Sequence, residues 1–183
     1  MTGSLVVAID VGIKNLSLCV FDFATNRVEQ WETVSLVKQG RYIPSLNVEY
    51  VRDFVEEKRS IFDNAFVVVI ERQMRANMRV IEALLQYIFV TRCVVVSPRS
   101  VKVHYDIGCR NYRANKQKAV RWAKAFCLRN PTAFASGLDA LISKAKKADD
   151  LADSLLLLMY YLDTYSNQMT TGTTTEWEQP VLD

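Results

Sequence analysis

The sequence predicts an α/β fold in which a mixed five-stranded sheet is flanked by helices. Two short apolar runs that end at Asp10 and Glu71 are rich in β-branched residues and have the length of buried strands. Elsewhere apolar residues recur with helical spacing, as in Arg75–Phe89. The expected order is three strands, a helix, a strand, a helix, a strand and then helices, which is typical of a mixed sheet with helices on its faces.

The chain has 183 residues, enough for one domain with a substantial core. It contains no internal repeat and no sign of a second domain. Residues 166–183 are rich in Thr and poor in apolar residues, so a flexible C-terminal tail is expected there. The predicted folded domain covers residues 1–165.

The first part of the chain is predicted to form an antiparallel meander of strands over Ser4–Asp10, Leu16–Phe23 and Val28–Val34. Residues 11–15 form the first turn, where Gly12 is expected to permit a positive φ. A hairpin turn over residues 24–27 joins the second strand to the third.

Helices and strands alternate in the rest of the chain. Arg75–Phe89 carries two apolar stripes, so it is expected to be buried on two sides, within the domain or against a partner. Residues 131–143 are assigned no element. The remaining elements are a helix over Val48–Phe62, a strand over Phe66–Glu71, a helix over Arg75–Phe89, a strand over Cys93–Ser97, a short helix over Ser100–Tyr105, a loop over Asp106–Asn115, a helix over Lys116–Leu128 and a last helix over Lys144–Tyr165.

The composition excludes several classes of protein. Half of the residues are apolar and 23% are charged, as in ordinary soluble domains. No run of 18 apolar residues exists, and the N-terminus lacks the basic region of a signal peptide, so an intracellular protein is expected. The four cysteines are widely spaced and only one histidine, His104, is present, which argues against a zinc site. Any bound metal should be a hard cation that prefers oxygen ligands.

The net charge of +3 is unevenly distributed. Between Arg92 and Arg129 the only acidic residue is Asp106, although ten Lys and Arg residues lie in that stretch. Such a stretch is found on solvated basic faces and on surfaces that bind polyanions. Here it leads directly into an acidic cluster, which strengthens the nucleic-acid interpretation.

Acidic residues occupy positions where buried elements seldom keep them. Asp10 and Glu71 end predicted strands, at the sheet edge where α/β proteins bind ligands. Asp150 and Asp153 are three residues apart, so they share one face of the last helix. Each acid alone has an ordinary explanation, such as a solvated strand end or a helix N-terminus. If all four converge, however, they need cations, and a pair of Mg²⁺ or Mn²⁺ ions is the arrangement that cleaves phosphodiesters.

Three segments carry a resemblance to a known family: residues 8–16, 69–73 and 146–155. In this order and spacing they resemble the RuvC-like Holliday junction resolvases of the RNase H-like superfamily, in particular the poxvirus branch. The resemblance implies an RNase H-like nuclease domain that resolves four-way DNA junctions by paired symmetric nicks. It further implies a homodimer formed through helix 75–89, and a role in viral genome concatemer resolution and recombination in the host cytoplasm.

The resemblance also implies roles for individual residues. Asp10, Glu71, Asp150 and Asp153 would bind two Mg²⁺ or Mn²⁺ ions per active site, with Asp149 as the alternative to Asp150. Lys116 is the expected catalytic cation, ahead of Lys118 and Lys102. The side chains expected to contact DNA are Lys102, Arg110, Arg113, Lys118 and Arg121. Bacterial members carry an aromatic residue shortly after the glutamate, and residues 72–75 contain none.

Three other readings are open. An RNase H or an integrase-like nuclease shares the superfamily, but the Asp-x-x-Asp of the last helix is typical of a resolvase. An actin-like or sugar-kinase ATPase also begins with Asp-x-Gly, yet the chain has no second phosphate motif and is too short for two lobes. A junction-binding protein without catalysis is disfavoured, because unneutralised carboxylates oppose the binding of DNA phosphates.

Overall fold

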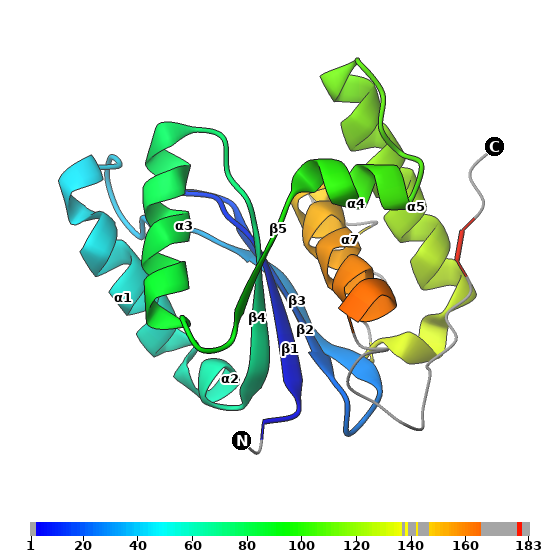
Figure 1. The fold of residues 1–183 in the computed structure, drawn as a ribbon, viewed down its shortest axis with the longest axis horizontal. Coiled ribbons are helices and arrows are strands. Elements are labelled where there is room, and N and C mark those ends of the chain that lie inside the picture. The colour runs from blue at the N-terminus through cyan, green and yellow to red at the C-terminus, as the bar shows by residue number, and fades with distance from the viewer. Residues whose placement is uncertain (1–2, 137, 139–141, 143–146, 166–178, 181–183) are drawn as a thin grey trace.

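The computed structural model describes residues 3–136, 138, 142, 147–165 and 179–180. Five strands form one mixed sheet in the order β3-β2-β1-β4-β5 (Figure 1), which confirms the predicted architecture. Pairing is antiparallel for β1 with β2 and for β2 with β3, and parallel for β1 with β4 and for β4 with β5. The strands are β1 (Leu5–Asp10), β2 (Leu16–Asp22), β3 (Arg27–Val34), β4 (Ala65–Glu71) and β5 (Cys93–Val96).

The central pair of strands, β1 and β4, is buried on both faces, which explains their unbroken apolar runs. Their parallel register aligns Ala8 with Val69 and Ile9 with Ile70. Ile9 and Ile70 are each followed by an acid, so Asp10 and Glu71 leave the sheet side by side at its C-terminal edge.

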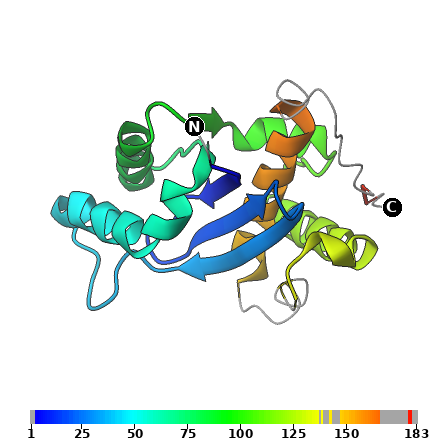
Figure 2. The same cartoon turned by 90° about the horizontal axis from the view of Figure 1, so that it is seen from below.

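Helices cover both faces of the sheet (Figures 1 and 2). Alternate residues of β1 divide the core, because Val7 and Ile9 pack with one group of helices and Val6 and Ala8 with the other. The first group is α1 (Asn47–Glu57), α2 (Arg59–Asp63) and α3 (Ala76–Ile88). The second group is α4 (Pro98–His104), α5 (Tyr112–Arg129) and α7 (Ala148–Tyr165). Short 3-10 helices cover Pro44–Leu46 and Pro131–Ala133.

Two helices differ from their predicted bounds for local reasons. The helix expected over Val48–Phe62 is divided at Lys58, which has φ −103° and ψ 20°. The helix expected from Lys116 begins at Tyr112 instead, because the side chain of Asn111 accepts a hydrogen bond from the Ala114 N–H at 3.1 Å. Residues 112–115 therefore belong to α5, not to the predicted loop.

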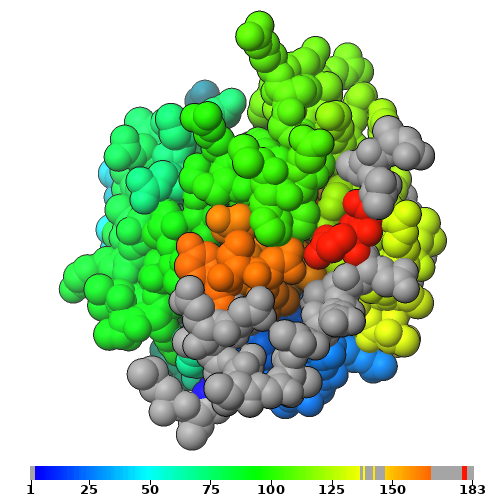
Figure 3. Space-filling model, turned by 45° about the vertical axis from the view of Figure 1, so that its right-hand side comes forward, coloured from blue at the N-terminus to red at the C-terminus, as the bar shows by residue number. Residues whose placement is uncertain are grey.

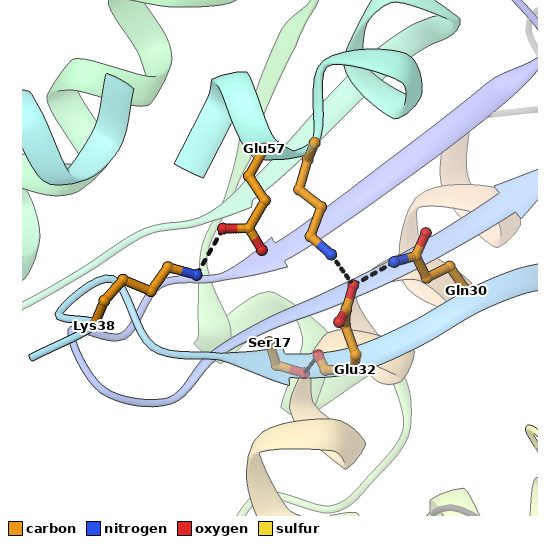
Figure 4. A network of polar contacts seen from close by, with 6 residues as sticks. Ser17, Gln30, Glu32, Lys38 and Glu57 are labelled. Atoms are coloured by element: carbon orange, nitrogen blue, oxygen red, sulfur yellow. Dashed lines mark hydrogen bonds and ion pairs between the residues drawn. The ribbon is translucent and has the colours of Figure 1, made fainter. Parts of the chain in front are cut away.

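Polar contacts tie the segment after β3 to the sheet (Figure 4). The break at Lys58 turns its ammonium toward Glu32 of β3, 2.6 Å from Oε1, and Gln30 donates to the same oxygen. Lys38 Nζ lies 2.6 Å from Glu57 Oε2, and this pair attaches the loop to the end of α1. The loop is thus attached to the end of α1, and the end of α1 is attached to β3.

Gly12 does not have the predicted positive φ, which among the described glycines occurs only at Gly40. Its small size matters for another reason, since a Cβ at Gly12 would lie 2.4 Å from the carbonyl oxygen of Asn15. A side chain there would disrupt the tight turn that follows Asp10.

The predicted tail over 166–183 lies outside the described residues, apart from Gln179 and Pro180. The side-chain amide of Gln179 donates to Asp163 Oδ2 of α7 at 3.3 Å. Figure 3 shows residues 179–180 in red on the surface next to α7 in orange. Among the described helices, none is long and apolar enough to span a membrane.

Candidate active site

The four predicted acids line one cleft of about 610 Å³ at the C-terminal edge of β1 and β4. Asp10 and Glu71 come from the strand ends, and Asp150 and Asp153 come from the first turns of α7. The predicted convergence is therefore present in the structure. Cationic side chains share the lining of the cleft: Lys14, Arg72, Arg75, Lys102, Lys116 and Lys147.

Asp10 and Glu71 are joined by a hydrogen bond between their carboxyl groups. Burial raises the pKa of Asp10 well above its usual range, and the charges of Glu71 and Asp153 raise it further. Burial also raises the pKa of Glu71, although the hydrogen bond with Asp10 and the charge of Lys102 act in the opposite direction. Without a cation, this pair therefore holds a proton more readily than exposed carboxylates do.

The two acids of α7 are perturbed in the same direction. Burial raises the pKa of Asp153 to about 7, and the charge of Glu71 contributes to the rise. The pKa of Asp150 is raised by burial and by the charge of Asp149. Among the described residues, Asp150 Oδ2 is buried with no hydrogen-bond partner. A buried carboxylate oxygen without a partner is costly, which suggests that a bound group satisfies it.

Buried hydrogen bonds fix the first turns of α7 against the sheet. Trp31 Nε1 of β3 donates to the carbonyl of Leu151 at 3.0 Å. The hydroxyls of Ser17 on β2 and Ser154 on α7 lie 2.8 Å apart. Ser17 is the register partner of Asp10. The contact between Ser17 and Ser154 therefore holds the start of α7 next to the strand end that carries Asp10. These contacts explain how Asp150 and Asp153 reach the sheet edge.

Lys116 of α5 also reaches the cleft, where it forms an ion pair with Asp149. Its ammonium lies 5.3 Å from the centroid of the Tyr112 ring. Burial lowers the pKa of Lys116, but the hydrogen bonds with Asp149 and Tyr112 outweigh burial and raise it. Asp149 thus faces Lys116, whereas Asp150 lines the cleft, which supports Asp150 as the candidate metal ligand.

The residues predicted to contact DNA are more dispersed. Lys102 lines the cleft, and its charge acts on Glu71 and Asp153. Arg113 and Arg121 line a shallow groove with Lys116 and Asp149, between α5 and the start of α7. Arg110 is exposed in the loop before α5, and Lys118 is half-buried on that helix. Their contribution to DNA binding stays a prediction.

Several lining residues were missing from the sequence-based assignment. Lys14, Arg72 and Arg75 follow the strand acids within four residues, so their place beside Asp10 and Glu71 in the chain was the available signal. Met74, which is 84% exposed, also lines the cleft and belongs to the stretch 72–75 that contains no aromatic residue.

The donor set suits a hard divalent cation. Within the described part of the chain, no three acidic, thiol or imidazole side chains are already arranged around one ion position. The cleft nevertheless gathers four carboxyl groups, all with raised pKa values, and one unsatisfied oxygen. Such oxygen-only sets match the preference of Mg²⁺ and Mn²⁺. The chemistry of these residues therefore fits the predicted metal.

Comparisons with known proteins agree with this geometry. A family model described as "Poxvirus A22 protein" matches residues 4–164. No curated protein sequence matches the chain.

Solved structures resemble the whole fold. The yeast mitochondrial Holliday junction resolvase is 17% identical, with a TM-score of 0.64 over 92% of this chain and 87% of that one. The fowlpox virus Holliday junction resolvase is 21% identical, with a TM-score of 0.61 over 87% of this chain and 98% of that one. RuvC of T. thermophilus, in complex with a Holliday junction substrate, is 15% identical, with a TM-score of 0.52 over 88% and 96% of the two chains. At these identities the likeness confirms the RuvC-like fold.

Proposed function

The chain belongs to the poxvirus A22 protein family, and we propose that it is a metal-dependent endodeoxyribonuclease that resolves four-way (Holliday) DNA junctions by paired symmetric nicks. The observation that carries this proposal is the convergence of Asp10, Glu71, Asp150 and Asp153 in one cleft whose rim is cationic. The resolvase titles of the structural neighbours support the choice of substrate.

The four carboxylates are the proposed ligands of two Mg²⁺ or Mn²⁺ ions. When bound, these ions would activate the attacking water and stabilise the leaving 3′ oxygen. The chain itself has two tasks. The carboxylates hold the ions at the sheet edge, and Lys116 places a fixed positive charge where the scissile phosphate gains negative charge. Lys102, which also lines the cleft, would attract the DNA backbone.

Two symmetric nicks require two active sites, so we propose a homodimer through α3. The outer face of this helix exposes apolar side chains: Val80 is 46% exposed, Tyr87 81% and Ile88 43%. Val80 and Tyr87 belong to the second of the two apolar stripes predicted from the sequence, and Ile88 belongs to the first. Exposure of these apolar side chains to water is unfavourable, and packing against the same face of a second copy would bury them.

The family also indicates where such an enzyme would work. A poxvirus protein of this type would resolve genome concatemers and recombination intermediates in the host cytoplasm. The location and the concatemer role both depend on the proposed activity.

The decisive experiment compares a labelled four-way junction, a linear duplex and an RNA–DNA hybrid, each with Mg²⁺ or with EDTA. We expect paired nicks in the junction only, and only with metal. Cleavage of the hybrid alone would identify an RNase H, and tight junction binding without cleavage in any metal would identify a non-catalytic binding protein. Either result would overturn the proposal.

A further inference from the structure

A buried carboxylate lies behind the cleft, outside the set of acids discussed above. Glu82 of α3 is only 7% exposed. Its Oε2 accepts a hydrogen bond from the backbone N–H of Gln73 at 2.7 Å, and its Oε1 accepts one from Gln86 Nε2 at 2.8 Å. Among the described residues, no Lys, Arg or His forms an ion pair with it. Burying an acid with neutral partners alone is costly, so its position calls for a reason.

Gln73 connects this carboxylate to the cleft. Its side-chain amide Nε2 lies 3.2 Å from Glu71 Oε2 and 3.2 Å from the Glu71 carbonyl oxygen. Three residues therefore form a continuous series, in which Glu82 holds the backbone of Gln73 and the amide of Gln73 holds the carboxylate of Glu71. The N–H of Arg72 donates to the Val96 carbonyl at 2.8 Å, so the intervening loop is anchored to β5 as well.

We propose that Gln73 and Glu82 are positioning residues that orient Glu71 for metal binding and link α3 to the cleft; this inference rests on the proposed function. The amide of Gln73 lies 3.2 Å from Glu71 Oε2, and this contact restricts the rotation of the Glu71 carboxylate. Groups that hydrogen-bond to metal ligands fix the ligand orientation, and removing them typically costs about 10–100-fold in metal affinity.

The alternative is that Gln73 and Glu82 only hold the loop after β4 in place and have no role at the metal site. This alternative explains only part of the arrangement. It accounts for the bond from Gln73 N–H to Glu82, but it does not account for the side chain of Gln73 turning back onto the Glu71 carboxylate.

The test measures Mn²⁺ binding to the full chain without DNA, by the loss of the free Mn²⁺ signal in electron paramagnetic resonance. Gln73→Met removes the amide donors but keeps the length of the side chain and the backbone N–H. Glu82→Ala removes the anchor of the loop, and Glu82→Gln retains an oxygen that accepts from Gln73 N–H. Gln86→Met is the matched control, because it removes the other donor to Glu82 and leaves the loop contacts in place.

We expect Gln73→Met and Glu82→Ala to raise the Kd for Mn²⁺ by about 10–100-fold. Glu82→Gln should recover most of that loss, and Gln86→Met should stay within about threefold of wild type, since it removes no contact with Glu71.

If Glu82→Ala does not fold, Gln73→Met decides the question alone. Unchanged Mn²⁺ affinity in Gln73→Met overturns the inference, even if the melting temperature falls, and so does a wild-type chain that binds no Mn²⁺. If wild type binds Mn²⁺ and the variants weaken it, but no junction is cut, the proposed function fails and the positioning roles stand.

Discussion

The ammonium of Lys116 is paired with the carboxylate of Asp149, the immediate neighbour of the acid that lines the cleft. Adjacent residues on a helix point about 100° apart, so the two carboxylates face different partners: Asp149 faces Lys116, and Asp150 lines the cleft. Asp149 fixes the candidate catalytic cation, and Asp150 contributes to the candidate metal site. The Asp-Asp pair that begins α7 therefore divides two tasks between two residues.

The two aspartates should respond differently to the same substitution. Asp150→Asn is expected to reduce junction cleavage by about 10³-fold or more. The substitution removes a proposed metal ligand, and a metal ion stabilises the transition state by several kcal/mol. Junction binding should survive or tighten, since one negative charge has been removed from the DNA surface. Asp149→Asn, the matched control, should slow cleavage by about tenfold or less, because Lys116 keeps its charge but loses its partner. Single-turnover cleavage and gel-shift titration measure both. Equal losses in the two variants would contradict the division of roles.

Lys116 itself should contribute to the rate more than to binding. Lys116→Met keeps the aliphatic stem and removes the charge, and we expect cleavage to slow by about 10²-fold or more if the charge stabilises the transition state. Lys118→Met on the same helix is the control, with an expected change below about threefold, because this half-buried residue lies off the cleft lining. A reversed pattern would transfer the catalytic role to Lys118.

The raised pKa of Asp153 predicts that the metal-free protein loses stability as the pH rises. Its pKa is about 7 in the folded chain against an ordinary value of 3.8. Between these values the folded state binds more protons than the unfolded state, so the free energy of unfolding falls as pH rises. In EDTA at pH 8, Asp153→Asn should raise the free energy of unfolding by about 1–3 kcal/mol. Urea denaturation at pH 4 and pH 8 measures this, and a larger gain at pH 4 would contradict it.

The outer face of α3 should determine the oligomeric state. Tyr87→Glu places a charge on a side chain that is 81% exposed in the single chain. We expect this variant to sediment as a monomer at concentrations where wild type is a dimer, because a buried unpaired charge is costly in an interface. The folded core should be unaffected, since Tyr87 is exposed. A wild-type chain that sediments as a monomer would remove the basis for the dimer.

The groove between α5 and the start of α7 should contribute to DNA binding through phosphates. Arg113 and Arg121 share a groove with Lys116 and are exposed. Replacing both by Ala should weaken junction binding at all sequences and reduce the slope of log K against log salt by about 1–2. Fluorescence anisotropy at several salt concentrations measures the slope. An unchanged slope would place the DNA path elsewhere.

The sheet and the convergence of the acids were predictable because they follow from local patterns. Runs such as Phe66–Glu71 can form only buried strands, and parallel neighbours bring their final residues to one edge. The start of α5 was not predictable from apolar spacing, since the Asn111 cap extends the helix through polar residues. The requirement for Gly12 arises from the approach of Asn15, not from φ. The contacts of Asp149 with Lys116, and of Glu82 with Gln73, depend on tertiary packing, and no spacing in the chain indicates them.

The helix α7 contributes two of the four acids, although it lies at the end of the folded region while Asp10 lies at its beginning. A fragment that ends before Ala148 would therefore contain only two of the four acids. Because α7 must pack beside Trp31 before the acids can meet, such a fragment is expected to lack the complete candidate site, whether it arises by proteolysis or by interrupted translation.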